Sequence, residues 1–107
     1  MKWSVEFLDQ ATLDLLSDLP SDIQASFARI VGLIEGHGLE RVREPYVKHL
    51  EGHLWEMRMN GKDGIARAAY ITATRKRVVV VHVFAKKSQK APRREIEYAL
   101  RRAKEVT

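Results

Sequence analysis

The chain has 107 residues and a formal net charge of +5, which suits one basic domain spanning residues 1–107. The absence of cysteine excludes a disulfide framework and a thiolate metal site. No apolar run reaches the roughly 18 residues of a membrane-spanning helix, and acidic residues near the N-terminus are unlike a signal peptide, so we expect a soluble cytoplasmic protein with no membrane partner.

The N-terminal third is predicted to form a strand and two helices. Residues 3–7 alternate large apolar with polar side chains, the period of a half-buried strand. Asp9 can cap a helix over residues 10–17. Ser21 and Gln24 have the spacing of a capping box at the start of a second helix. The apolar stripe of that helix is typical of packing on a sheet: Ile23, Phe27, Ile30 and Ile34.

The remainder of the chain is predicted to be mainly strand. Residues 39–52 have no regular period and contain Pro45, so we expect an irregular connection. Three consecutive strands follow, at residues 53–59, 64–73 and 78–84. A last helix begins near Pro92. The order β-α-α-β-β-β-α predicts an α+β domain in which a helical hairpin and a C-terminal helix lie on one face of a mainly antiparallel sheet.

Basic residues are concentrated in the second half of the chain. Residues 1–47 hold four Lys or Arg against eight Asp or Glu, a net charge of −4. Residues 48–107 hold fifteen against six, a net charge of +9. A basic half in a small domain favours a polyanionic partner such as nucleic acid. A solvated face that only keeps the protein soluble is the alternative explanation.

The candidates for chemistry are cationic and aromatic. The four histidines are scattered, with no metal-ligand spacing, and we find no Walker-type loop or nucleophile motif. Arg67 lies within a predicted strand, where a guanidinium is costly unless it faces solvent, a carboxylate or a ligand. An ion pair with Glu56, or a charge that protects a sheet edge, explains Arg67 equally well. An imidazole transfers protons near neutral pH, but the strand around His82 favours a packed structural role, as does that around Tyr70.

Three segments carry motifs that occur in the same order in a known family. Residues Lys48–Arg58 resemble K-x-L-x-x-G-L-W-E-L-R, Arg67–Tyr70 resemble R-x-x-Y, and His82–Pro92 resemble H-x-F-x-K-K-T-x-K-x-P. Together they resemble the HigB-like, phage-derived branch of the RelE/ParE toxin superfamily, over almost the whole chain. The sequence departs from these motifs only at His53, Met57 and Ser88. None of these three residues is a proposed site residue.

This resemblance implies the toxin of a type II toxin–antitoxin system, a ribosome-dependent endoribonuclease that cuts messenger RNA during translation. It implies an attack by the 2′-hydroxyl on the adjacent phosphodiester, with no metal or other cofactor. It also implies a cognate antitoxin, HigA-like with a helix-turn-helix domain, that forms a hetero-oligomer with the toxin.

The resemblance suggests roles for individual side chains. Arg67 and Lys86 are expected to contact the scissile phosphate, where fixed cations stabilise charge that grows in the transition state. His82 and Tyr70 are candidates for proton transfer or for orienting the reacting groups. Phe84 is expected to stack on a base. The remaining expected RNA contacts are basic: Arg58, Lys48, Lys87 and Lys90.

Three other functions fit the same sequence. A ParE-like toxin would inhibit DNA gyrase through surface contacts, whereas the lysines after residue 84 favour a nuclease. A non-catalytic RNA-binding module would use the same charges without cleavage. An inactive relic of a toxin would bind only its antitoxin.

Overall fold

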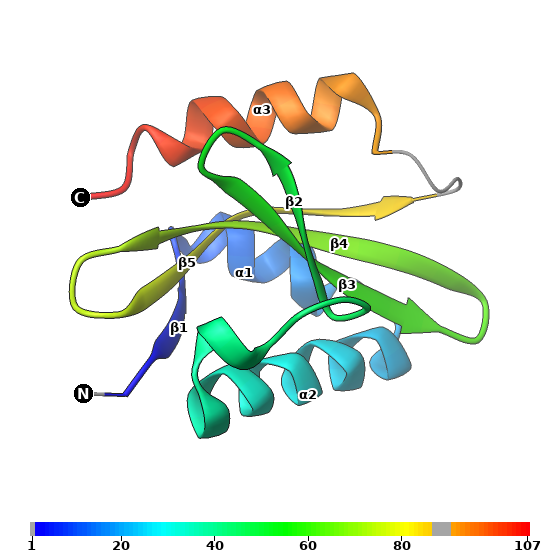
Figure 1. Cartoon of the computed structure of the whole chain (residues 1–107). Coiled ribbons are helices and arrows are strands. Elements are labelled where there is room, and N and C mark those ends of the chain that lie inside the picture. The colour runs from blue at the N-terminus through cyan, green and yellow to red at the C-terminus, as the bar shows by residue number, and fades with distance from the viewer. Residues whose placement is uncertain (1, 87–90) are drawn as a thin grey trace.

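The computed structural model describes residues 2–86 and 91–107. Figure 1 shows the elements in chain order: β1 (Ser4–Phe7), α1 (Gln10–Ser17), α2 (Ser21–His37), the 3-10 turn η1 (Leu39–Arg41), β2 (Val47–Glu51), β3 (Leu54–Gly61), β4 (Gly64–Ala73), β5 (Arg77–Lys86) and α3 (Arg93–Ala103). The predicted α+β class and helical hairpin are confirmed. One strand, β2, was not predicted, because it lies in the region expected to be irregular. The described residues include no helix that is long and apolar enough to cross a membrane.

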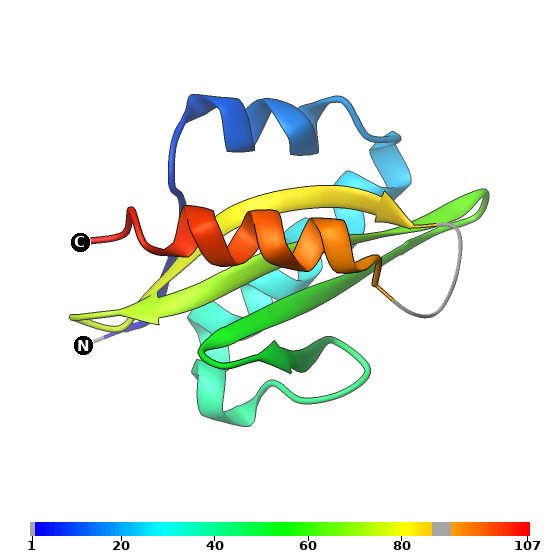
Figure 2. The same ribbon diagram turned by 90° about the horizontal axis from the view of Figure 1, so that it is seen from above.

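The five strands form one sheet in the order β1-β5-β4-β3-β2. The pairs β2–β3, β3–β4 and β4–β5 are antiparallel, and β1 pairs with β5 in parallel. Ser4 in the first strand therefore lies opposite Arg77, which is far from it in the sequence. The sheet is mainly antiparallel, as predicted, and α1 runs beside β5 near the β1 edge (Figure 2).

The helices cover both faces of the sheet, which corrects the prediction that they share one face. Figure 1 shows α2 below the sheet and α3 above it. Ile30 and Ile34 of α2 belong to one buried cluster, whereas Ala99 of α3 belongs to a second. The second cluster also contains Val79 and Val81, which alternate along β5 with valines of the first cluster. A strand that is apolar on both sides needs a covering layer on each.

The helix caps agree with the sequence at one position and differ at another. Asp9 caps α1, because its Oδ1 accepts hydrogen bonds from Thr12 N at 3.0 Å and from Thr12 Oγ1 at 2.7 Å. The predicted capping box at α2 is wrong: Ser21 is the first helical residue, after Pro20, and no side chain caps this end. Gln24 instead donates to the backbone oxygen of Leu19 at 2.8 Å and so ties the turn between the helices.

A β-bulge changes the register between β4 and β5. Ala69 lies opposite His82, whereas the next residue, Tyr70, lies opposite Val80. Val81 is therefore an extra residue in β5. An extra residue reverses the alternation of side chains beyond it, so Phe84 follows His82 onto the face covered by α3.

Candidate active site

Three cations surround one carboxylate on the α3 face of the sheet. Arg58 of β3 lies directly opposite Arg67 of β4, and Arg67 lies opposite Phe84 of β5. Like charges placed opposite each other destabilise a sheet unless an anion lies between them. We call the set Glu56, Arg58, Arg67 and Lys86 the cationic cluster.

Glu56 supplies the anion. Its Oε2 lies 3.4 Å from Arg67 Nε and 3.7 Å from Arg58 Nε. Only 3% of Glu56 and 2% of Arg67 are exposed. The predicted alternative, an ion pair between Arg67 and Glu56, is therefore confirmed. Within the described part of the chain, Glu56 Oε1 and Arg67 Nε make no hydrogen bond, although both atoms are buried. Buried polar atoms left in this state are uncommon and call for an explanation.

Lys86, at the end of β5, adds a third cation beneath the surface. Only 6% of the residue is exposed. Burial lowers the pKa of Lys86, and the neighbouring charge of Arg67 lowers it further. Burial likewise lowers the pKa of Arg67. Both shifts show that positive charge is crowded here in poorly solvated surroundings.

Aromatic rings extend the cluster toward α3. The His82 ring stacks on Phe84, with centroids 5.4 Å apart, and meets the Tyr98 ring edge-on at 4.7 Å. His82 Nε2 lies 3.1 Å from Glu95 Oε1, so a carboxylate of α3 orients this ring. Phe84 is only 5% exposed, which leaves little of its ring for the predicted stacking on a base. Tyr98 is 40% exposed.

The structure separates Tyr70 from the other predicted site residues. Tyr70 is 1% exposed and belongs to the cluster of apolar side chains under α2, on the opposite face of the sheet. Burial raises the pKa of its hydroxyl, which makes proton release harder. The assignment of Tyr70 to the catalytic residues is therefore corrected to a packing role. Two further predicted contacts, Lys87 and Lys90, lie outside the described residues.

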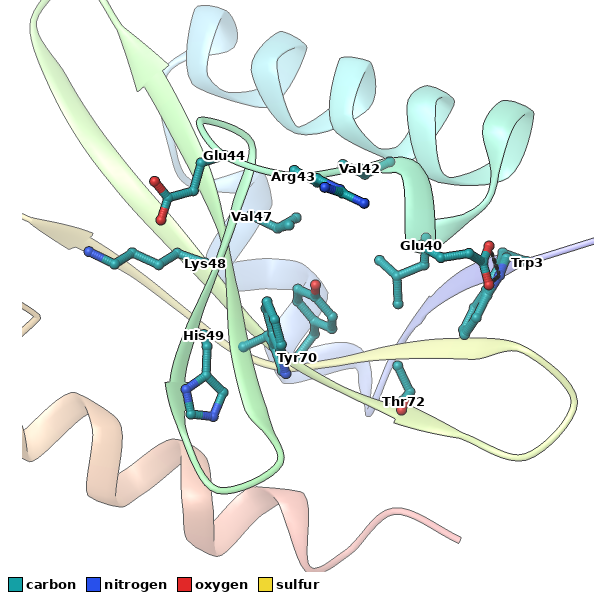
Figure 3. A pocket seen from close by; sticks show the side chains of 12 residues that line it. Trp3, Glu40, Val42, Arg43, Glu44, Val47, Lys48, His49, Tyr70 and Thr72 are labelled. Atoms are coloured by element: carbon teal, nitrogen blue, oxygen red, sulfur yellow. Dashed lines mark hydrogen bonds between the residues drawn. The ribbon is translucent and has the colours of Figure 1, made fainter.

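A cavity of about 660 Å³ lies on the face opposite the cationic cluster. Figure 3 shows Tyr70 and Val47 inside it, with Trp3 and Glu40 on the far side. Lys48 lines this cavity, but its side chain extends away from Tyr70. The register places Lys48 opposite Glu56. The positive charge of Lys48 also contributes to the lowered pKa of Lys86. Lys48 therefore lies at the border between the cavity and the cationic cluster.

The sequence predicted Glu56 only as a structural ion-pair partner of Arg67, and it did not indicate Tyr98 as a site residue. The sequence does contain a signal for Tyr98. This residue lies four residues after Arg94 and three before Arg101, the spacing that places side chains on one face of a helix. Among the described residues, no group of three or more His, Asp or Glu side chains could hold a metal ion. The cationic cluster and the neighbouring His82 place cations and an imidazole on one face of the sheet.

Comparison with known proteins agrees with this architecture. A structure of an archaeal RelE–RelB complex from Pyrococcus horikoshii has a similar fold, with a TM-score of 0.56 and 21% sequence identity over 79% of this chain and 96% of that chain. The fold is thus RelE-like. The family model of the phage-derived Gp49-like proteins matches residues 14–104, and the chain belongs to that family. A sequence comparison with curated proteins finds no match.

Proposed function

We propose that this chain is the toxin of a toxin–antitoxin pair and that it cleaves messenger RNA on the ribosome. The observation that carries the proposal is the cationic cluster: among the described residues, Arg58 and Arg67 both lie beside the carboxylate of Glu56, and the charge of Lys86 lies close to them. The remaining positive charge attracts an anion, and RNA presents a phosphate at every nucleotide. The RelE-like fold and the three motifs that resemble RelE/ParE toxins support RNA as that anion.

The proposed reaction forms one bond to phosphorus and breaks another. The 2′-oxygen of one nucleotide bonds to the adjacent phosphorus, and the bond from phosphorus to the next 5′-oxygen breaks. A base takes the 2′-hydroxyl proton and an acid protonates the 5′-oxygen, so the products are a cyclic phosphate and a 5′-hydroxyl. Negative charge grows on the phosphate oxygens, where fixed cations are most effective.

The geometry supports different positions for the three cations. The Arg58 side chain is 22% exposed, so it contacts the phosphate from the surface. Arg67 and Lys86 are almost fully buried, and they stabilise the negative charge of the same phosphate from beneath the surface. His82 is the candidate for proton transfer, because Glu95 orients its ring beside the cluster. Lys48 is a further candidate RNA contact at the border of the cluster.

We further propose a cognate antitoxin as the protein partner. The P. horikoshii structure is a complex of RelE with RelB, which supports a partner of that kind here. A HigA-like antitoxin with a helix-turn-helix domain fits the resemblance of this chain to HigB-like toxins, and the complex would be a hetero-oligomer.

Induction of the chain alone in bacteria tests the nuclease. We expect growth arrest and cuts in a reporter mRNA that disappear when its translation is blocked. Arg58→Gln and Lys86→Met should each reduce cleavage by about 10²- to 10³-fold. Arg29→Gln is the matched control, since Arg29 is exposed on α2 and lies outside the cluster. Arrest with intact mRNA and inhibited gyrase would favour a ParE-like toxin. No arrest would favour a binding module or a relic.

A further inference from the structure

The four arginines of α3 divide into two pairs with different surroundings. Arg93 contacts Glu51 of β2 and Glu97, and Arg102 contacts Asp9 and Glu105, so these two arginines fasten the helix to the domain. Arg94 and Arg101 are exposed and, among the described residues, point to no such partner. In the described ranges 2–86 and 91–107, neither has a carboxylate within ion-pair distance. Two unneutralised cations on one helix can bind an external anion.

Tyr98 lies between these two arginines along the helix. Residues 94, 98 and 101 follow the four- and three-residue spacing that places side chains on one face. The Arg101 guanidinium carbon is 5.6 Å from the centre of the Tyr98 ring, a cation–π distance. The ring is 40% exposed. We call Arg94, Tyr98 and Arg101 the α3 stripe.

The α3 stripe adjoins the candidate active site. The Tyr98 ring meets His82, and His82 stacks on Phe84, which lies opposite Arg67 in the sheet. Phe84 and His82 are buried, so Tyr98 is the ring of this row that a ligand can reach. Because Tyr98 contacts His82 next to the cationic cluster, a chain bound at that cluster can continue onto α3.

We propose that the α3 stripe binds single-stranded RNA, with a base stacked on Tyr98 and phosphates held by Arg94 and Arg101. This inference rests on the proposed function for its choice of ligand, and it adds a binding surface next to the site of cleavage. Exposed aromatic rings between basic residues bind single strands without regard to sequence, because every base has a flat face. An acidic peptide would use the two charges but not the ring.

The test is binding of a 2′-O-methyl RNA of about eight nucleotides, whose blocked 2′-oxygens prevent cleavage, to the purified full chain by fluorescence anisotropy. Tyr98→Leu should weaken binding by about tenfold, and Tyr98→Phe should keep it within about twofold. Arg94→Gln and Arg101→Gln, at exposed positions, should each lower the slope of log K against log salt by about one. Trp55→Leu is the control for an exposed ring, since Trp55 is 39% exposed and lines the cavity on the opposite face.

Each outcome decides the proposal. Equal binding by the wild-type chain, Tyr98→Leu and Arg101→Gln would overturn it, as would no binding by the wild type. Competition by an octaglutamate peptide as strong as that by unlabelled RNA would also overturn it, because stacking would then contribute nothing. If the variants of the α3 stripe bind RNA as well as the wild type while reporter mRNA is still cut, the proposed function stands without this binding surface. If mRNA stays intact while Tyr98→Leu still weakens RNA binding, only the cleavage proposal fails.

Discussion

Arg67 and Glu56 form an ion pair in the interior of the sheet, with 3.4 Å between Arg67 Nε and Glu56 Oε2. Removing one partner of such a pair leaves a buried charge without compensation. We expect Glu56→Gln to lower the free energy of unfolding by about 3–5 kcal/mol, measured by urea denaturation. The double variant Glu56→Gln/Arg67→Met should recover part of this loss. Equal stability of Glu56→Gln and the wild type would show that the pair is solvated rather than buried.

The lowered pKa of Lys86 predicts how RNA affinity depends on pH. Lys86 is charged only below its pKa, and burial together with Arg67 holds that pKa below the ordinary lysine value. Affinity for 2′-O-methyl RNA, measured over a series of pH values, should therefore fall as the pH rises through this lowered pKa. Lys86→Met should remove this step. Arg67→Met should move it to higher pH, and a shift in the opposite direction would contradict the electrostatic explanation.

Asp9 predicts a loss of stability in acid. Hydrogen bonds from Arg102 and Thr12 lower its pKa from 3.8 to about 2 in the folded chain. A carboxyl group with a lower pKa in the folded state stabilises that state above its unfolded pKa. This contribution is lost as the pH falls from about 4 through about 2. Thermal melts followed by circular dichroism should show a smaller drop over this window for Asp9→Asn than for the wild type; parallel curves would exclude the linkage.

Two glycines of the β3–β4 hairpin predict opposite effects of alanine. A Cβ at Gly61 would lie 2.7 Å from Ile23 Cγ1 and 2.8 Å from Asp22 Oδ1. Gly61→Ala should therefore lower the free energy of unfolding by about 1–3 kcal/mol. A Cβ at Gly64 has no atom within 4 Å, so Gly64→Ala should be neutral or stabilising by up to about 1 kcal/mol. A similar cost at both positions in urea denaturation would show that the hairpin, rather than the contact with α2, is sensitive.

Much of the fold could be predicted because local patterns and packing agree. The helical stripe containing Ile30, and the β-branched run in residues 78–81, each indicate the element that the structure contains. β2 could not be predicted, since this edge strand forms through its backbone pairing with β3 rather than through an apolar pattern of its own. The place of α3 was also missed, because periodicity shows which side of a helix is apolar but not which face of the sheet it covers.

The candidate site was predicted in part, for a related reason. Residue type and motif spacing indicated Arg67, Lys86 and His82, which the strand register then brings to one face. Tyr70 shares a motif with Arg67, but the two are three positions apart in a strand and so point to opposite faces. Tyr98 lies far from the motifs in the sequence and joins the site only through the packing of α3 on β5.

The bulge at Val81 means that the site depends on residue number as well as residue identity. His82, Phe84 and Lys86 lie on the same face as Val79, although an odd number of positions separates them from it, because Val81 is unpaired in β5. Deleting Val81 would leave a regular strand in which Val80 and His82 are neighbours, so the imidazole and the ammonium group would keep the α3 face. Deleting Val83 would instead turn Phe84 and Lys86 toward the opposite face. Deletion of Val81 should therefore be tolerated better than deletion of Val83, and a library that contains only substitutions would not detect this difference.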